Sequence, residues 1–188
     1  YLLVTLDAGS QDELDNMLEQ MAELVLDAGA MDVLVADTPA KIKDAWAARS
    51  SFLEAIMHET KLLDECDVVV PVNKIADYLD FVNKTGEDCG LVIKSFGHAG
   101  DGNLHIYQCS NDLEEEEFKS RVDKFFEIIY REATNCGGLV SGEHGIGSGK
   151  IKYLVDSVGE TNMALMEGIK RVFDPKMILN PGKVCYRL

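Results

Sequence analysis

The 188-residue sequence lacks long apolar runs, paired cysteines and an excess of basic residues. No apolar run approaches the roughly 20 residues that a helix needs to span a bilayer, so we expect no transmembrane segment. The start, YLLVTLDAGS, lacks the basic region of a signal peptide. The five cysteines are scattered and never form a Cys-x-x-Cys pair, which argues against a disulfide framework and a thiolate zinc site. We therefore expect a cytoplasmic location.

Basic residues are few beside acidic ones, 18 against 33, which gives a formal charge of -15. This field repels nucleic acid and acidic membrane surfaces. A small anionic substrate would have to be held by a few local cations or by a metal. The composition is that of a soluble globular domain. Because the chain starts directly on an expected strand without an initiator Met, we expect residues 1–188 to be one domain of a longer protein.

The apolar patterning predicts strands and helices that often alternate, with one hairpin. Strands are expected at 2–8, 31–37, 66–72, 91–98 and 104–110, and helices at 10–29, 38–63, 73–86 and 112–138. Ser10 and the Thr38-Pro39 pair are helix-start signals. The pattern predicts an α+β fold, an antiparallel or mixed sheet covered by helices in a ferredoxin-like arrangement.

Two of the four histidines flank a turn signal in KSFGHAGDGNLHIYQ. If Asp101-Gly102 forms a two-residue turn, His98 lies directly opposite His105, with Cβ atoms roughly 4.5 to 5.5 Å apart. That spacing suits two imidazoles that bind one metal ion. The alternative is an ordinary tight turn between partly buried histidines.

A third ligand is available in LVSGEHGIGSGK, where Glu143 and His144 are adjacent. In an extended segment they point to opposite sides, so Glu143 completes a His-His-carboxylate set while His144 addresses something else. Such a set suits zinc, iron or manganese, and a nearby imidazole can move protons near neutral pH. The glycines fit neither a phosphate loop nor a dinucleotide fingerprint. Lys150 is either an anion contact or a surface lysine.

Three separated motifs, GHAGDGNLH, SGEHGIGSGK and FDPKMILNPGKV, occur in this order. With them, nearly the whole chain resembles the C-terminal (cap) domain of FAD-linked oxidases of the vanillyl-alcohol oxidase type. The nearest branch is that of D-lactate dehydrogenase, glycolate oxidase and D-2-hydroxyglutarate dehydrogenase. The resemblance implies oxidation of a D-2-hydroxy acid to the 2-oxo acid, with FAD bound mainly by an N-terminal domain. The isolated chain is then expected to be inactive.

The resemblance also implies roles for individual residues. His98, His105 and Glu143 match the positions that bind a divalent metal, and His144 matches the general base beside the flavin. Arg49 resembles the arginine that pairs with the substrate carboxylate. In LNPGKV, the resemblance makes Asn180 and Lys183 cofactor-binding residues, whereas the residues alone are equally typical of a Pro-Gly turn that ends a helix.

The chain departs from hydroxyglutarate-oxidising members at two positions, Tyr107 and Leu53, where an Asn and a Thr are expected. A small monocarboxylate, D-lactate or glycolate, is therefore the favoured substrate. Expected partners are the FAD-binding domain and an electron-transfer flavoprotein or iron–sulfur subunit. Two alternatives stay open, a self-contained metal-dependent hydrolase that uses the His-His-Glu set and a non-catalytic partner-binding module.

Overall fold

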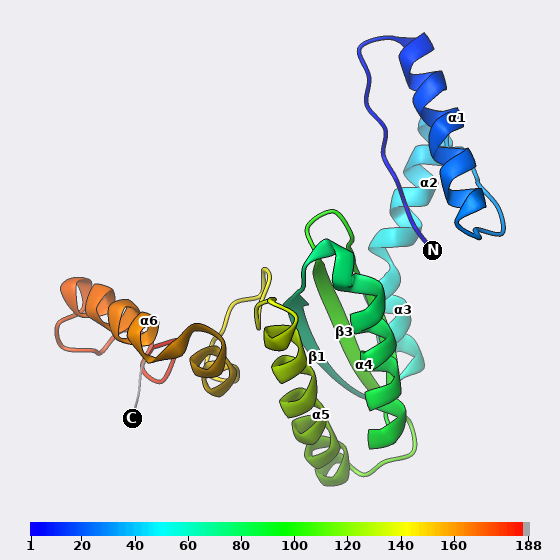
Figure 1. Cartoon of the computed structure of the whole chain (residues 1–188). Coiled ribbons are helices and arrows are strands. Elements are labelled where there is room, and N and C mark those ends of the chain that lie inside the picture. The colour runs from blue at the N-terminus through cyan, green and yellow to red at the C-terminus, as the bar shows by residue number, and fades with distance from the viewer. Residues whose placement is uncertain (186–188) are drawn as a thin grey trace. The chain divides into compact units, whose positions relative to one another are not determined.

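The computed structural model describes residues 1–185, which divide into two compact units, residues 1–52 and the chain from Leu53 onward. Figure 1 shows the elements in chain order: α1 Gln11–Asp27, α2 Pro39–Ser50, α3 Phe52–Glu59, β1 Leu62–Val69, the 3-10 turn η1 Val72–Lys74, α4 Ile75–Cys89, β2 Val92–His98, β3 Asn103–Ser110, α5 Glu115–Asn135 and α6 Ile151–Phe173. Among the described residues, no helix is long and apolar enough to cross a membrane.

The first unit contains two capped helices, as the sequence predicted. The Ser10 side chain accepts the N–H of Glu13 at 3.3 Å, and the Thr38 side chain accepts that of Lys41 at 3.3 Å. These contacts satisfy backbone donors that lack partners within the first helical turn.

The strands predicted at 2–8 and 31–37 in this unit are wrong, because neither segment belongs to a strand in the described part of the chain. Alternating apolar residues define the two faces of a strand, but a strand also needs a neighbour to pair its backbone groups. Leu2, Leu3 and Leu34 are exposed here. The predicted alternation of strand 2–8, helix 10–29 and strand 31–37 is therefore absent, and only the helix forms.

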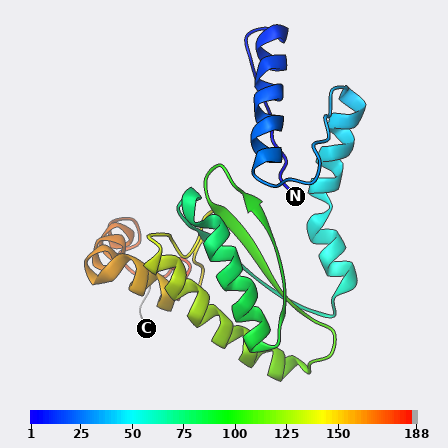
Figure 2. The ribbon, with the colours of Figure 1, turned by 45° about the vertical axis from the view of Figure 1, so that its right-hand side comes forward.

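The second unit is built on a three-stranded antiparallel sheet in the order β1-β3-β2. Helices α4 and α5 pack on one face, as Figure 2 shows, and α5 contacts β1 while α4 contacts β2. Apolar side chains fill the space between them, among them Val68, Tyr78, Leu104, Ile106 and Phe125. This arrangement confirms the predicted α+β fold with an antiparallel sheet covered by helices.

Two element boundaries differ from the prediction in ways that matter for the site. The helix predicted at 38–63 is two helices that break at Ser51, whose hydroxyl donates to the carbonyl of Ala47 at 2.9 Å. The strand predicted at 66–72 begins instead at Leu62 and ends at Val69.

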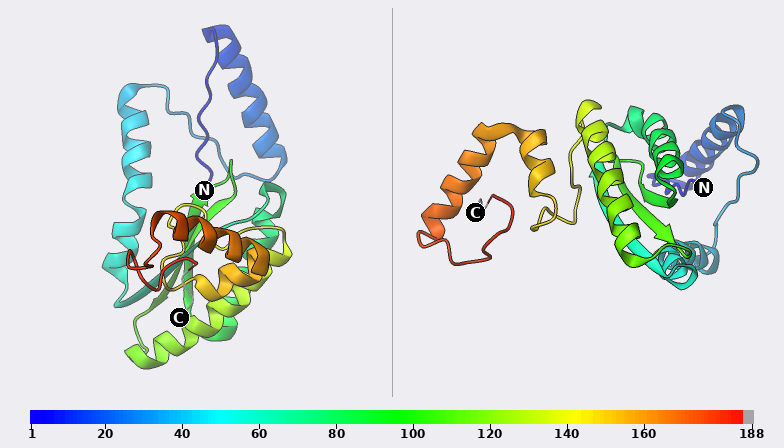
Figure 3. Two further views of the ribbon diagram at one scale, coloured as in Figure 1. Left: turned by 90° about the vertical axis from the view of Figure 1, so that its left-hand side faces the viewer. Right: turned by 90° about the horizontal axis from the view of Figure 1, so that it is seen from below.

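Helix α6 lies in a stretch to which we assigned no element, and it bends where Gly159 has a φ of 76° (Figure 3).

The sheet face away from α4 and α5 carries a group of polar and titratable residues. Side chains alternate between faces along a strand, so Glu65 and Asp67 of β1 share this face with His105 and Tyr107, their partners across the ladder. A small apolar cluster of Ile56, Tyr107 and Cys109 covers part of it. This face positions the candidate site.

Candidate active site

The β2–β3 hairpin brings both predicted histidines to the site, with a different register from the one predicted. His98 pairs with Asn103, and Phe96 pairs with His105, so the prediction that His98 faces His105 is wrong by two residues. The connection is the four-residue loop 99–102, in which the His98 carbonyl accepts the N–H groups of Asp101 at 3.3 Å and Gly102 at 3.0 Å. Because the pairing register differs from the prediction by an even number of residues, both imidazoles still lie on one face of the sheet. Their ring centroids lie 6.1 Å apart.

Glu143 and His144 lie in a tight loop, residues 141–145, and not in the extended segment that we predicted. The carboxylate of Asp67 on β1 organises this loop. Its Oδ2 accepts the backbone N–H groups of Gly142, Glu143 and His144 at 2.7, 2.9 and 3.1 Å. The Ser141 hydroxyl donates to the same oxygen at 3.0 Å. One buried side chain thus sets the positions of both site residues.

Lys150 completes the environment of Asp67. Its ammonium forms an ion pair with Oδ1 of Asp67 and donates to the backbone carbonyl of that residue at 3.2 Å. Burial alone would raise the pKa of the Asp67 carboxyl, but the Lys150 ammonium and the backbone N–H donors outweigh burial and hold that pKa well below its usual value. Neither of our two expectations for Lys150, an anion contact or a surface lysine, describes this internal ion pair.

His98, His105 and Glu143 bring one ligand atom each within 4.8 Å of one another. His105 Nε2 lies 2.8 Å from Glu143 Oε1, and the His105 side chain is only 7% exposed, against 53% for Glu143. Two imidazoles and a carboxylate are the donor types that zinc, iron and manganese share. The residues predicted to bind a metal therefore converge, and their chemistry fits a divalent ion with an open coordination position.

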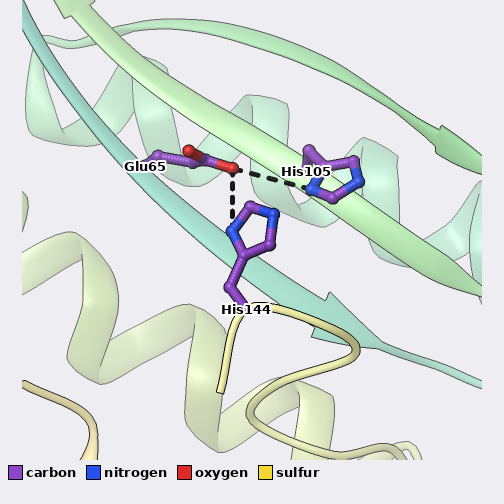
Figure 4. Close-up of side chains that lie close together, drawn as sticks. All are labelled: Glu65, His105 and His144. Carbon is purple, nitrogen blue, oxygen red and sulfur yellow. Dashed lines mark ion pairs between the residues drawn. The ribbon is translucent and has the colours of Figure 1, made fainter. Parts of the chain in front are cut away.

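A second group on the same face consists of Glu65, His105 and His144 (Figure 4). Oε1 of Glu65 lies 3.2 Å from Nδ1 of His144 and 3.6 Å from Nδ1 of His105. The two imidazoles stack with centroids 4.9 Å apart and planes 28° from parallel. The sequence analysis missed Glu65, because it falls between the predicted end of a helix and the predicted start of a strand.

Tyr107 is buried directly opposite Glu65 in the β1–β3 ladder. Burial, and then the charge of Glu65 and a hydrogen bond to it, raise the pKa of the Tyr107 hydroxyl. This hydroxyl therefore stays protonated beside the Glu65 carboxylate. The sequence marks Tyr107 as a residue of interest, because hydroxyglutarate-oxidising members are expected to have an Asn at this position.

The roles of three other predicted site residues stay predictions. Arg49 belongs to α2 in the first unit, whose placement relative to the sheet is not defined, so its role stays a prediction. Asn180 and Lys183 are exposed in the turns that follow α6. Asn180 has a φ of 46°. Their cofactor-binding role also stays a prediction.

Comparison with known proteins adds independent information. The family model for the C-terminal domain of FAD linked oxidases matches residues 1–184. The chain is 60% identical over its full length to a D-lactate dehydrogenase of Anaerostipes hadrus, of which it covers 40%. It is 33% identical over 185 residues, 97% of its length, to glycolate oxidase subunit GlcD of Bacillus subtilis, of which it covers 38%.

Among solved structures, the chain is similar to 4-ethylphenol oxidase from Gulosibacter chungangensis in complex with isoeugenol. The TM-score is 0.61 over 94% of this chain and 37% of that chain, at 16% sequence identity. This likeness shows a shared fold. The chain spans about two fifths of the length of the two curated relatives.

Proposed function

This chain belongs to the family of C-terminal domains of FAD-linked oxidases, and from that premise we propose that it is the substrate- and metal-binding domain of an FAD-dependent dehydrogenase. The proposed reaction oxidises a D-2-hydroxy acid to the 2-oxo acid, with D-lactate or glycolate as substrate. The names of the two relatives support this substrate class. We further propose that an N-terminal domain of a longer protein binds the FAD, and that an electron-transfer flavoprotein or iron–sulfur subunit takes up the electrons.

The observation that carries the proposal is the convergence of His98, His105 and Glu143 beside His144. Oxidation of a hydroxy acid removes a proton from the hydroxyl oxygen and a hydride from the α-carbon. When bound, FAD supplies the hydride acceptor, and a divalent ion at the three ligands supplies a Lewis acid. Nδ1 of His144 faces Glu65, so Nε2 of His144 is the atom that takes the hydroxyl proton.

Electrostatics also favour a cation in the site. Glu65 and Glu143 place two carboxylates close to His105, and the chain carries a formal charge of -15. A substrate carboxylate would be repelled by this surface without compensation. A divalent ion, together with Arg49 as the residue that pairs with the substrate carboxylate, supplies that compensation.

Family membership favours the oxidoreductase over both alternatives considered from the sequence, the self-contained hydrolase and the non-catalytic module. No contact in the described residues favours either of them. The proposed activity belongs to the full-length flavoprotein, and the chain alone supplies the groups that bind the substrate and handle its proton.

The test measures metal content and flavin reduction in the full-length flavoprotein. We expect about one divalent ion per chain, and anaerobic bleaching of the flavin by D-lactate or glycolate and not by L-lactate. The His105→Ala variant should lose the ion and slow flavin reduction by more than the roughly 100-fold typical of outer-shell changes. His58→Ala, at an exposed position of α3, is the matched control. A wild-type protein that contains no metal yet oxidises D-lactate would overturn the metal assignment.

A further inference from the structure

Glu65 is an ionisable side chain of the site to which the proposed function gives no role as a metal ligand or as the base. It lies on β1, and a single oxygen, Oε1, faces Nδ1 of His144 at 3.2 Å and Nδ1 of His105 at 3.6 Å, as the dashed lines in Figure 4 mark. Its carboxylate thus lies on the Nδ1 side of both imidazoles.

Two of these atoms are buried without a hydrogen-bond partner among the described residues, Glu65 Oε1 and His105 Nδ1. Buried polar groups in folded proteins almost always have a partner, so each such atom requires an explanation. A neutral imidazole carries one N–H, on either nitrogen. If His105 carries it on Nδ1, the two unpaired atoms satisfy each other after a small movement.

Protons on the Nδ1 atoms of the two histidines leave both Nε2 atoms unprotonated. Nε2 of His105 faces Glu143 at 2.8 Å, inside the proposed metal set. A proton on Nδ1 leaves Nε2 with the lone pair that a metal bond needs. For His144, a proton on Nδ1 leaves the lone pair on Nε2, the atom that takes the substrate proton.

The position of Glu65 itself is well constrained. Tyr107 lies opposite it in the ladder, and the Tyr107 hydroxyl interacts with the Glu65 carboxylate, which helps to raise the pKa of that hydroxyl. Phe96 stacks on Tyr107 with centroids 5.1 Å apart and contacts the His105 ring at 5.7 Å. The stacked rings therefore fix Tyr107 opposite Glu65 and pack against the His105 ring that Glu65 faces.

We propose that Glu65 is a positioning residue for the reaction: it accepts the Nδ1–H of both His105 and His144, and so makes Nε2 of His105 the metal ligand and Nε2 of His144 the base. This inference rests on the proposed function. A carboxylate behind a metal-bound histidine commonly fixes its tautomer and ring orientation. Here one carboxylate serves a ligand and a base together.

The first measurement follows flavin reduction by D-lactate in the metal-loaded, full-length Glu65→Gln flavoprotein. The limiting rate of flavin reduction should fall by about 10- to 100-fold, because a carboxamide also offers N–H groups that favour the wrong tautomer. The apparent Kd for D-lactate should stay unchanged, since Glu65 acts through the histidines. Glu65→Asp, which keeps the charge, should recover part of the rate.

Asp64→Asn is the matched control, because it removes the same charge from the neighbouring residue of β1. Asp64 is exposed, and side chains of neighbouring strand residues point to opposite faces. Its limiting rate and metal content should equal those of the wild type. Equal losses in Glu65→Gln and Asp64→Asn would show that the net charge of the strand matters and would overturn the positioning role.

The second measurement does not depend on activity. In the zinc-loaded, full-length flavoprotein, [15N]histidine labelling reports the ring nitrogens. The signals lost in His144→Ala are assigned to His144, and exposed His58 is the reference. We expect His144 to be protonated at Nδ1 in the wild type and to populate both tautomers in Glu65→Gln. If no hydroxy acid reduces the wild-type flavin, the proposed function fails while this measurement still tests Glu65.

Three further results would overturn the proposal. One is an unchanged limiting rate and unchanged tautomers in Glu65→Gln. Another is a raised Kd with an unchanged limiting rate, which would make Glu65 a substrate contact. The third is two bound ions in the wild type and one in Glu65→Gln, which would make Glu65, His105 and His144 ligands of a second cation, since their ligand atoms also lie within 4.8 Å of one another.

Discussion

The two segments that bring histidines to the site, the β2–β3 hairpin and the 141–145 loop, are held in place by different means. The hairpin belongs to a ladder with seven paired positions between β2 and β3, so its geometry is spread over many backbone bonds. In the described part of the chain, the loop has one isolated bridge nearby, between Val69 and Leu139, and depends on the Asp67 carboxylate. A hairpin thus tolerates the loss of one contact, whereas the loop depends on one residue.

The largest expected effect comes from Asp67→Asn. This change leaves the partly buried Lys150 ammonium without its counter-ion and places an amide N–H₂ beside backbone donors. We expect the free energy of unfolding to fall by about 3 to 5 kcal/mol, and metal binding to weaken because Glu143 loses its fixed position. Urea denaturation, with exposed Asp64→Asn as control, measures the first effect. An equal, small change in both variants would mean that the loop does not depend on Asp67.

The pH dependence of stability sharpens this comparison. The pKa of Asp67 is lowered in the folded protein, so its charge contributes stability that is fully present above the usual value of 3.8 and declines as the pH falls below that value. The gap in unfolding free energy between wild type and Asp67→Asn should therefore be constant from about pH 7 to pH 5 and shrink near pH 3. Urea denaturation at these pH values is the measurement.

Gly102→Ala tests the hairpin and should have a smaller effect. Gly102 has a φ of 82°, and an added Cβ would collide with the carbonyl oxygen of Val70. We expect the free energy of unfolding to fall by about 1 to 3 kcal/mol, with the site loop and its metal set retained.

Gly100→Ala provides the control for this prediction. Gly100 lies in the same turn, but an added Cβ there meets no heavy atom within 4 Å in the described structure. It should leave stability nearly unchanged in urea denaturation. If both alanine variants were equally mild, strain at Gly102 would not be what shapes the turn.

The same contrast explains what the sequence could predict. The hairpin with His98 and His105 was predictable, because strand alternation and an Asp-Gly turn are local signals. Its register was off by two, because the turn uses four residues, yet an even shift keeps side chains on the same face. The loop was not predictable in form, because its anchor, Asp67, lies 75 residues before Gly142 in the chain.

Glu65 shows a second limit of reading the sequence. The helical pattern extends to Leu63 and the apolar run of the strand begins at Cys66, so the sequence predicts no face for Glu65. In the structure β1 begins at Leu62, and the alternation places Glu65 on the same face as Asp67. A boundary error of four residues therefore hid a site residue, although the convergence of Glu143 with the histidines was anticipated.

The smallest expected effect is that of Ser141→Ala. This change tests how much of the loop's stability comes from the serine hydroxyl and how much from the Asp67 carboxylate. The Ser141 hydroxyl donates to Asp67 Oδ2 at 3.0 Å and accepts the N–H of Gly145 at 2.9 Å. Its removal leaves three backbone donors and Lys150 on Asp67, so we expect a loss of about 0.5 to 1.5 kcal/mol in urea denaturation. The exposed Ser95→Ala variant of β2 is the control. A loss as large as that of Asp67→Asn would show that the serine and the carboxylate act as one unit.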